Sequence, residues 1–347
     1  MSSDGQETRQ RRAGQSKGRD EVETRYTKAA WEALAHFPVE ADRLELVAQS
    51  ENVTFRVSVR GGETDCVLRL HRPGYSSIEE LESERIWVRA LKETGVAVPE
   101  SIETCLGGDY VLTDIPGAAE QRYAGMTTWQ EGVPLRSFLE SCPVGVERRR
   151  ILSRFGEIAA TFHDQSTRWR PPPGFVRRRL DLDALLGEAP FWGRFWEHRE
   201  LSKGEQELLL RARAGAGAAL GAYGETLENF SLIHADFTPD NVIYNGGDLA
   251  VIDFDDCAYG WHLYDIASAL IECRFGRDCD SLQSAFLDGY RARRPLAKQD
   301  IDLLPQFELL RGMAIIGWFH QRPEFAGEAE FDRVKTWVID ECRRRKF

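Results

Sequence analysis

The pattern of apolar residues changes near residue 131, and this change constrains the fold more than any other feature of the chain. Before it, short apolar and β-branched runs predict strands, with one long helix predicted over 77–94. After it, apolar residues recur at helical spacing, as in 148–163. We therefore expect an α+β protein with two lobes. The N-terminal lobe, 23–131, should hold an antiparallel sheet with one long helix, and the C-terminal lobe, 132–347, should be mainly helical.

Turn residues separate the predicted strands of the first lobe. The link 60–63, Arg-Gly-Gly-Glu, is suited to a hairpin between two of them, and Gly95 is expected to end the long helix. The runs that predict strands are 44–47, 53–59, 66–71, 110–113 and 121–129. Further helices are predicted over 25–37 and 203–220.

Length and composition exclude several classes of protein. A chain of 347 residues exceeds what one compact core usually supports, and 42% hydrophobic residues are ordinary for a globular protein. The net charge of −11 argues against nucleic acid as a partner. No run reaches the ~18 to 20 apolar residues of a membrane span, and the seven cysteines contain no CxxC pair. We expect a protein of the cytoplasm with no membrane partner, preceded by a disordered polar tail over 1–22.

The segment 231–267 contains seven aspartates and no Lys or Arg. Apolar, β-branched runs joined by Asn245-Gly246-Gly247 flank these aspartates, so paired strands should bring the loop at Asp236 close to Asp253. Clustered carboxylates raise one another's pKa values unless a cation lies between them. Oxygen ligands favour Mg²⁺, usually shared with substrate phosphates. The segment therefore predicts a magnesium site.

The spacing His234-x-Asp236-x-x-x-x-Asn241, followed by Asp253, resembles the catalytic and metal-binding loops of the protein-kinase-like superfamily. More narrowly, HADFTPDNVIY, VIDFDD and GWHLYDIA are similar to the corresponding motifs of aminoglycoside phosphotransferase and choline kinase-like enzymes, including homoserine-kinase-type and stress-response kinases. The similarity extends over most of the chain from about residue 44. It implies a bilobal protein-kinase-like fold and ATP-dependent transfer of the γ-phosphate to a hydroxyl of a small molecule.

The resemblance also implies a role for each motif residue. Asp236 would accept the proton of the attacking hydroxyl or orient it, and general-base assistance is worth about 10²- to 10⁴-fold in rate. Asn241 and Asp253 would hold Mg²⁺ at the phosphates of ATP. His234 would be a scaffold residue, and Asp265 would anchor the loop.

Two further residues are expected to grip the phosphates of the nucleotide. Kinases of this superfamily pair a basic residue on the third strand with a glutamate on the following helix, and the matching positions are Arg69 and Glu84. Glu84 falls inside the apolar stripe of its helix, where a carboxylate needs a partner, and Glu82 is the fallback. Lysine is the more familiar residue at the position of Arg69. The segment 49–54, where a phosphate-covering loop is expected, has no glycine.

The junction at 127–132 corresponds to the family's hinge, so backbone groups of Thr128 and Gln130 are expected to contact adenine. The acceptor is expected to bind in the helical lobe. An acidic chain suits a cationic acceptor such as an amino alcohol, an amino acid or an aminoglycoside, although a sugar remains open. Residues that would line the acceptor site are Trp192, Trp196, Trp261, Trp318, Asp255 and Glu272.

Three alternatives remain at this point. The first is a protein serine/threonine kinase of the stress-response type, although Asp256 is followed so soon by Tyr264 that no long activation segment fits between them. The second is a nucleotide-binding pseudokinase, which the complete set of motif residues opposes. The third is a metal-dependent hydrolase, which lacks a second histidine near His234.

Overall fold

The computed structural model describes residues 23–62, 64–275, 279–325 and 327–347, so the tail predicted to be disordered lies outside the described residues. The chain divides into two units. One comprises the chain up to Arg89 together with Pro99–Glu131, and the other comprises Ala90–Val98 with Gly132–Phe347. The short segment 90–98 groups with the second unit because the Ala97 carbonyl accepts a hydrogen bond of 2.9 Å from the Val251 N–H.

The N-terminal unit contains the predicted antiparallel sheet. Its strands are β1 (Ala41–Gln49), β2 (Val53–Val59), β3 (Cys66–Leu70), β4 (Ser101–Ile102), β5 (Tyr110–Asp114) and β6 (Gln121–Thr128). The order is β1-β2-β3-β6-β4, and β5 also pairs with β6. All pairings in this sheet are antiparallel.

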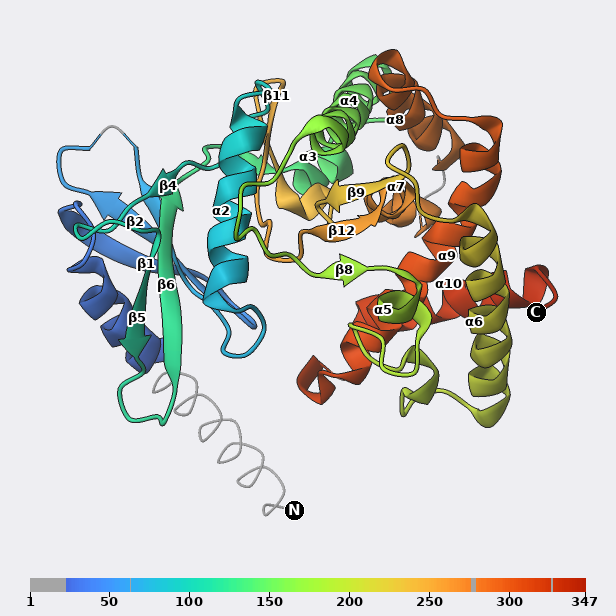
Figure 1. The fold of residues 1–347 in the computed structure, drawn as a ribbon, viewed down its shortest axis with the longest axis horizontal. Helices are drawn as coiled ribbons and strands as arrows, with labels where there is room; N and C mark the ends of the chain where they lie inside the picture. Colours follow the sequence, from blue (N-terminus) through green and yellow to red (C-terminus); the bar gives the residue numbers. More distant parts are fainter. Residues whose placement is uncertain (1–22, 63, 276–278, 326) are drawn as a thin grey trace, which may run out of the picture. The chain divides into compact units, whose positions relative to one another are not determined.

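The alternation of side chains along β2 and β3 gives this sheet one apolar face. Phe55 and Leu68 from that face are buried against Ala29 and Ala30 of a helix over 23–34. The long helix α2 (Ile78–Lys92) lies on the other face (Figure 1), where Arg85 donates a hydrogen bond of 2.9 Å to the Tyr110 hydroxyl. The predicted fold class is confirmed for this unit.

The C-terminal unit is mainly helical, as predicted. Its helices are α3 (Leu135–Ser141), α4 (Val146–Arg168), α5 (Leu182–Leu186), α6 (Lys203–Tyr223), α7 (His262–Leu270), α8 (Cys279–Arg293), α9 (Lys298–His320) and α10 (Ala329–Arg344). Two small sheets, β11-β10-β7 and β8-β12-β9, carry the functional loops. Their strands are β7 (Val133–Pro134), β8 (Arg179–Leu180), β9 (Phe230–Ile233), β10 (Val242–Asn245), β11 (Asp248–Val251) and β12 (Ala258–Trp261).

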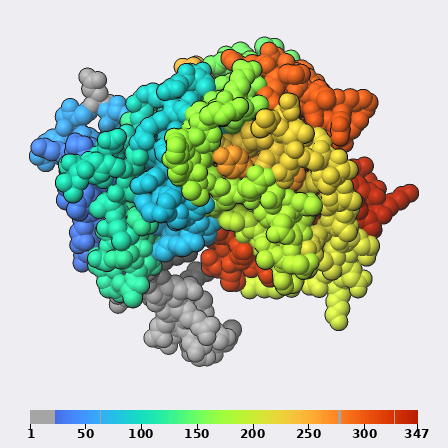
Figure 2. Space-filling model, in the orientation of Figure 1, coloured from blue at the N-terminus to red at the C-terminus, as the bar shows by residue number. Residues whose placement is uncertain are grey.

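Glycines allow α4 and α8 to cross closely. A Cβ atom on Gly156 would lie 2.0 Å from the carbonyl oxygen of Phe286, and one on Gly289 would lie 1.8 Å from that of Ser153. Both distances are impossible contacts, so these positions require glycine. By contrast, α6 runs along the outer surface of this unit (Figure 2) and buries only its apolar stripe, which includes Leu209.

Among the described helices, none combines the length and the uninterrupted apolar character that a membrane span needs.

Candidate active site

The loop between β9 and β10 brings Asp236 and Asn241 into direct contact. The amide nitrogen of Asn241 donates to Oδ2 of Asp236 at 2.8 Å and to the Asp236 carbonyl at 2.9 Å. Both partners of this Asn241 atom are hydrogen-bond acceptors, so the atom must be the donor of the side-chain amide, which is its nitrogen. The Asn241 amide oxygen is therefore directed elsewhere. The side chain of Asp236 is 30% exposed and can be reached from solvent.

Asp253 follows Ile252, whose backbone is hydrogen-bonded to the loop that contains Asn241. The N–H of Ile252 donates to the Asn241 carbonyl at 2.9 Å, and the ladder Val242–Val251 precedes this bond. Backbone pairing thus brings the predicted metal ligands together.

Two residues of the site have a left-handed backbone. Ala235 has φ 67° and Asp253 has φ 64°, and within the described ranges only Lys346 is a further non-glycine residue of this kind. The left-handed region costs a non-glycine residue roughly 1–2 kcal/mol, and such strain gathers at functional sites.

Asp265 on α7 holds the strained loop. Its carboxylate accepts hydrogen bonds from the backbone N–H groups of His234 (2.9 Å) and Ala235 (2.7 Å), which confirms the predicted anchoring role. The ring of His163 lies 3.3 Å from the same carboxylate. Burial raises the pKa of Asp265 to about 6, although the interactions with His234 and Ala235 oppose this rise.

His234 is a scaffold residue, as predicted. It is fully buried, and its ring lies 4.7 Å from that of Phe254. Its Nε2 donates to the Ile252 carbonyl at 3.0 Å, which ties the loop to the end of β11.

Arg311 on α9 is a site residue that the sequence analysis missed. It forms an ion pair with Oδ1 of Asp236 and is only 11% exposed. Burial lowers the pKa of Arg311, but the charge of Asp236 and contact with Tyr264 outweigh this effect, so the guanidinium stays charged. Glu84 was identified because a charged residue inside an apolar stretch needs a partner. The same reasoning applies to Arg311, which lies inside the mainly apolar run 307–316.

A cavity of about 280 Å³ opens beside Asp236 in the C-terminal unit. Three of the residues expected at the acceptor site line this cavity, namely Trp192, Trp318 and Glu272. Trp196, Trp261 and Asp255 were expected at the same site but do not line this cavity. Further lining residues are Arg136, Thr238, Asp240, Asn241, Asp256, Ile271, Arg311, Ala314, Ile315, Phe319 and Glu330.

The three remaining expected lining residues have structural contacts that explain their positions. Trp196 lies under the guanidinium of Arg213 at 4.3 Å, and Trp261 donates to the Gly224 carbonyl at 2.9 Å. The backbone carbonyl of Asp255 accepts a hydrogen bond of 2.7 Å from Arg177.

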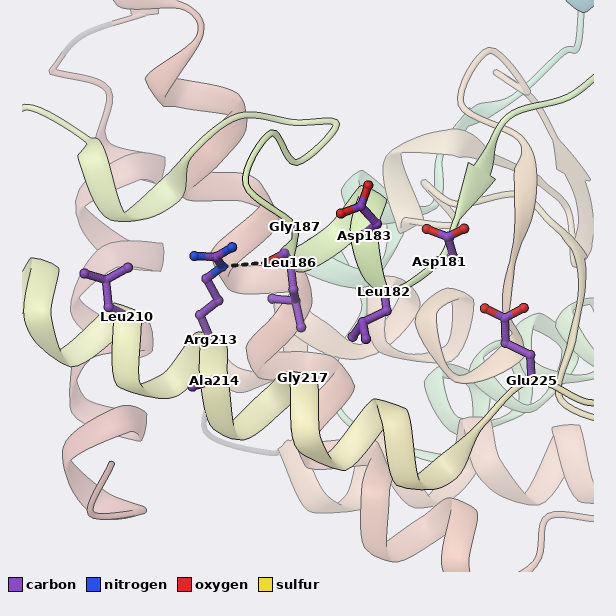
Figure 3. A pocket seen from close by; sticks show the side chains of 10 residues that line it. All are labelled: Asp181, Leu182, Asp183, Leu186, Gly187, Leu210, Arg213, Ala214, Gly217 and Glu225. Carbon is purple, nitrogen blue, oxygen red and sulfur yellow. Dashed lines mark hydrogen bonds between the residues drawn. The ribbon is translucent and has the colours of Figure 1, made fainter.

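A larger cavity of about 580 Å³ lies between α5 and α6 (Figure 3). Two of its three lining carboxylates already serve the fold: Asp181 caps α5 through the Ala184 N–H, and Glu225 pairs with Arg179, while Asp183 is the third. Arg213 donates to the Leu186 carbonyl at 2.6 Å. This cavity contains none of the motif residues.

The predicted nucleotide residues of the N-terminal unit lie where their elements were expected. Arg69 is on β3, half-buried and in register with Thr54 and Gly125. Glu84 is buried on α2, whereas Glu82 is exposed, so Glu84 is the better partner. The pairing of Arg69 with Glu84 stays a prediction.

The structure narrows the predicted hinge contacts. The Thr128 N–H donates to the Glu100 carbonyl at 2.9 Å, so this N–H already has a partner within the N-terminal unit. The side chain of Gln130 donates to Oγ1 of Thr128 at 3.3 Å.

Backbone and side-chain hydrogen bonds hold the glycine-free turn between β1 and β2 in place. The Ser50 N–H donates to the Asn52 carbonyl, so this N–H is not open to phosphate. Arg122 donates to the Glu51 carbonyl at 2.9 Å, and the Arg72 N–H donates to Oδ1 of Asn52 at the same distance.

The donor chemistry of the site fits a hard cation. Asn241 and Asp253 offer an amide oxygen and a carboxylate, the ligand types that Mg²⁺ prefers. Across the part of the chain that the structure describes, no three His, Cys, Asp or Glu side chains gather as a metal-binding group. A cation held here would therefore take further oxygens from nucleotide and water.

Comparison with known proteins agrees with this geometry. The sequence model of the phosphotransferase enzyme family matches residues 43–298. The structure of a microcompartment-associated aminopropanol kinase is similar at a TM-score of 0.76 and 30% identity, covering 91% of this chain and 94% of that one. An amicoumacin kinase in complex with AMP-PNP, Ca²⁺ and Ami shares the fold at a TM-score of 0.74 and 19% identity, covering 94% and 96%. A homoserine kinase of Chelativorans sp. (strain BNC1) is 35% identical over 130 residues, which are 36% of this chain and 39% of that protein.

Proposed function

This chain belongs to the phosphotransferase enzyme family and is a kinase, and we propose that it transfers the γ-phosphate of ATP to the hydroxyl of a small amine-bearing alcohol. One observation carries the proposal. The carboxylate of Asp236, held by Asn241 and Arg311, lies in the wall of a cavity large enough for a small molecule.

The charge of this cavity supports a cationic acceptor. Two guanidinium groups face five carboxylates, which leaves an excess of three negative charges. The carboxylates are those of Asp236, Asp240, Asp256, Glu272 and Glu330. Trp192 adds an aromatic ring to the lining, and aromatic rings attract ammonium groups, whereas the ring of Trp318 already has the guanidinium of Arg322 4.3 Å from its centroid. The similarity to an aminopropanol kinase supports an amino alcohol above the other acceptor classes.

In the proposed reaction, Asp236 accepts a hydrogen bond from the acceptor hydroxyl and orients it. As the hydroxyl oxygen forms its bond to the γ-phosphorus and the bond to ADP breaks, the proton passes to Asp236. Mg²⁺, when bound at Asn241 and Asp253, would supply stabilisation of phosphate charge. In the N-terminal unit, Arg69, Glu84, Thr128 and Gln130 remain predicted nucleotide contacts.

The acceptor panel is the direct test. The protein is incubated with ATP, Mg²⁺ and 1-amino-2-propanol, choline, homoserine, a sugar, an aminoglycoside and a serine-containing peptide, and mass spectrometry detects the gain of one phosphoryl group. We expect 1-amino-2-propanol to gain it, and Asp236→Asn to remove most of this turnover. Labelling of the peptide alone would instead support a protein kinase, and undiminished turnover by Asp236→Asn would reject the role of Asp236.

A further inference from the structure

Arg136, the second residue of α3, joins two walls of the acceptor cavity. Its Nε lies 2.6 and 2.7 Å from the carboxylate oxygens of Asp240, and its Nη1 lies 2.8 Å from Oε2 of Glu272. Asp240 belongs to the short helix η2 (Pro239–Asn241), and Glu272 belongs to η3 (Ile271–Phe275). One guanidinium therefore satisfies two of the five carboxylates that face the acceptor.

The geometry of this bridge makes it hard to displace. Hydrogen bonds between charged groups are shorter and stronger than those between neutral groups, and a fork that contacts both oxygens of one carboxylate adds energy and geometric specificity. The side chains of Arg136 and Glu272 are 27% and 17% exposed, so solvent screens this pair only in part, whereas Asp240 is 49% exposed and its pair with Arg136 is screened more. An ammonium group that enters the cavity must use other carboxylates unless it displaces the guanidinium.

We propose that Arg136 sets the charge selectivity of the acceptor cavity, so that alcohols with one ammonium group are accepted and alcohols with two are disfavoured. The inference rests on the proposed function and adds to it a residue that determines specificity. Discrimination arises because the guanidinium of Arg136 already occupies Asp240 and Glu272, so these two carboxylates offer less to a second ammonium group. Without the guanidinium, Asp240 would lose this partner and Glu272 would keep only the more distant Arg333, so the two carboxylates would form a second cation site.

A matched pair of alcohols tests this selectivity. The compounds 1-amino-2-propanol and 1,3-diamino-2-propanol share a carbon skeleton and a secondary hydroxyl and differ by one amine. For Arg136→Gln, the ratio of kcat/KM for the diamine to kcat/KM for the monoamine should rise about tenfold, a change expected from one added ion pair in a partly buried site. Arg136→Lys, which keeps the charge, should stay within about threefold of the wild-type ratio.

Arg333→Gln provides the control for a general loss of positive charge. Arg333 on α10 lies 3.6 Å from the same oxygen of Glu272 but does not line the cavity. Its loss should leave the ratio nearly unchanged. Glu272→Gln removes one carboxylate while Arg136 stays, so it should lower the ratio, and it tests the proposal independently if Arg136→Gln fails to fold.

Equilibrium binding separates this inference from the proposed function. Calorimetry with AMP-PNP and Mg²⁺ measures the affinities of both amines without turnover. If neither amine is phosphorylated but the affinity ratio shifts in Arg136→Gln, the acceptor assignment fails and the role of Arg136 stands. If both amines are phosphorylated and neither the kinetic nor the binding ratio changes in the Arg136 and Glu272 variants, the role of Arg136 is overturned. Binding of neither amine by any variant overturns both.

Discussion

The guanidinium of Arg311 donates a hydrogen bond to one oxygen of the Asp236 carboxylate, while Asn241 donates to the other. Both oxygens of the proposed base are therefore held in place before a substrate binds. Each carboxylate oxygen has a second lone pair, so a hydroxyl group can still be accepted. The two partners thus give the base a fixed direction without blocking it.

Replacing Arg311 should reduce turnover more than nucleotide binding. In Arg311→Met, Asp236 loses the ion pair that orients it, and small misplacements of a reacting group cost up to about 10²-fold in rate. We expect kcat to fall by about 10- to 100-fold, with the KM for ATP within about threefold. Arg311→Lys should recover part of the loss, because it restores the charge but not the planar fork. Steady-state kinetics measure kcat and the KM for ATP of both variants. A rise in this KM with unchanged kcat would contradict the positioning role of Arg311.

Asp253→Ala should remove most of the effect of Mg²⁺ on nucleotide affinity. A lost carboxylate ligand weakens the hold on the cation, and the phosphates lose the charge that it supplies. Titrations of AMP-PNP with and without Mg²⁺ measure this difference. The control is Asp248→Ala, an exposed aspartate at the start of β11 in the same segment. Equal Mg²⁺ dependence in both variants would refute the assignment of Asp253.

The pKa of Asp265 predicts a specific dependence of stability on pH. Burial raises its pKa to about 6 in the folded chain, against ~3.9 for an unperturbed aspartate. The folded state therefore binds the proton more tightly, and the contribution of this group to the free energy of unfolding falls as pH rises from about 4 to about 6, by up to about 3 kcal/mol. Burial also lowers the pKa of neighbouring His163 well below its usual value.

Denaturant unfolding of Asp265→Asn isolates this contribution. At neutral pH the variant should lose about 1–3 kcal/mol, because an amide cannot accept both backbone hydrogen bonds with its two terminal atoms. Between pH 4 and 7, its free energy of unfolding should fall less than that of the wild type. Parallel pH profiles for the two proteins would show that Asp265 is not the titrating group.

Gly156→Ala should destabilise the C-terminal unit strongly. The new Cβ would overlap a backbone carbonyl of α8, and overpacking of this kind costs about 1–3 kcal/mol or more. The matched control is Gly221→Ala on the surface of α6, where no atom beyond the adjoining residues and backbone of the helix itself lies within 4 Å of the added Cβ. There, alanine should stabilise the helix by about 0.5–1 kcal/mol. Urea unfolding of both variants measures the contrast, and similar stabilities would exclude the close crossing of α4 and α8.

Features written in a local pattern could be predicted from the sequence. Alternation along β2 and β3 specifies which side of the sheet is buried, because successive side chains in a strand point to opposite faces. The catalytic motif is also local: Asp236 and Asn241 are five residues apart, and a hairpin brings Asp253 to them. Strands of two residues, such as β7, carry too little pattern to be recognised.

The acceptor side could be predicted only in part, because its residues come from distant elements. Arg136 and Arg311 are 175 positions apart in the sequence, and no periodicity relates them. The presence of a tryptophan also does not predict which residues line the cavity. Trp192 lines it and Trp196 does not, although both are buried and lie close together in the sequence. The packing of the helices decides which of them faces a ligand.

The grouping of Ala90–Val98 with the second unit affects how this protein can be dissected. The backbone of Ala97 completes a parallel bridge with Ala250 and accepts from the Val251 N–H, next to the strand end that leads to Asp253. If the chain were divided after residue 131, segment 90–98 would be part of the N-terminal fragment, although it packs with the C-terminal unit. The C-terminal fragment would then lack the backbone partner that Ala97 provides at the edge of β11. Neither half is thus a natural unit of expression, and domain exchange with a relative would need two junctions in place of one.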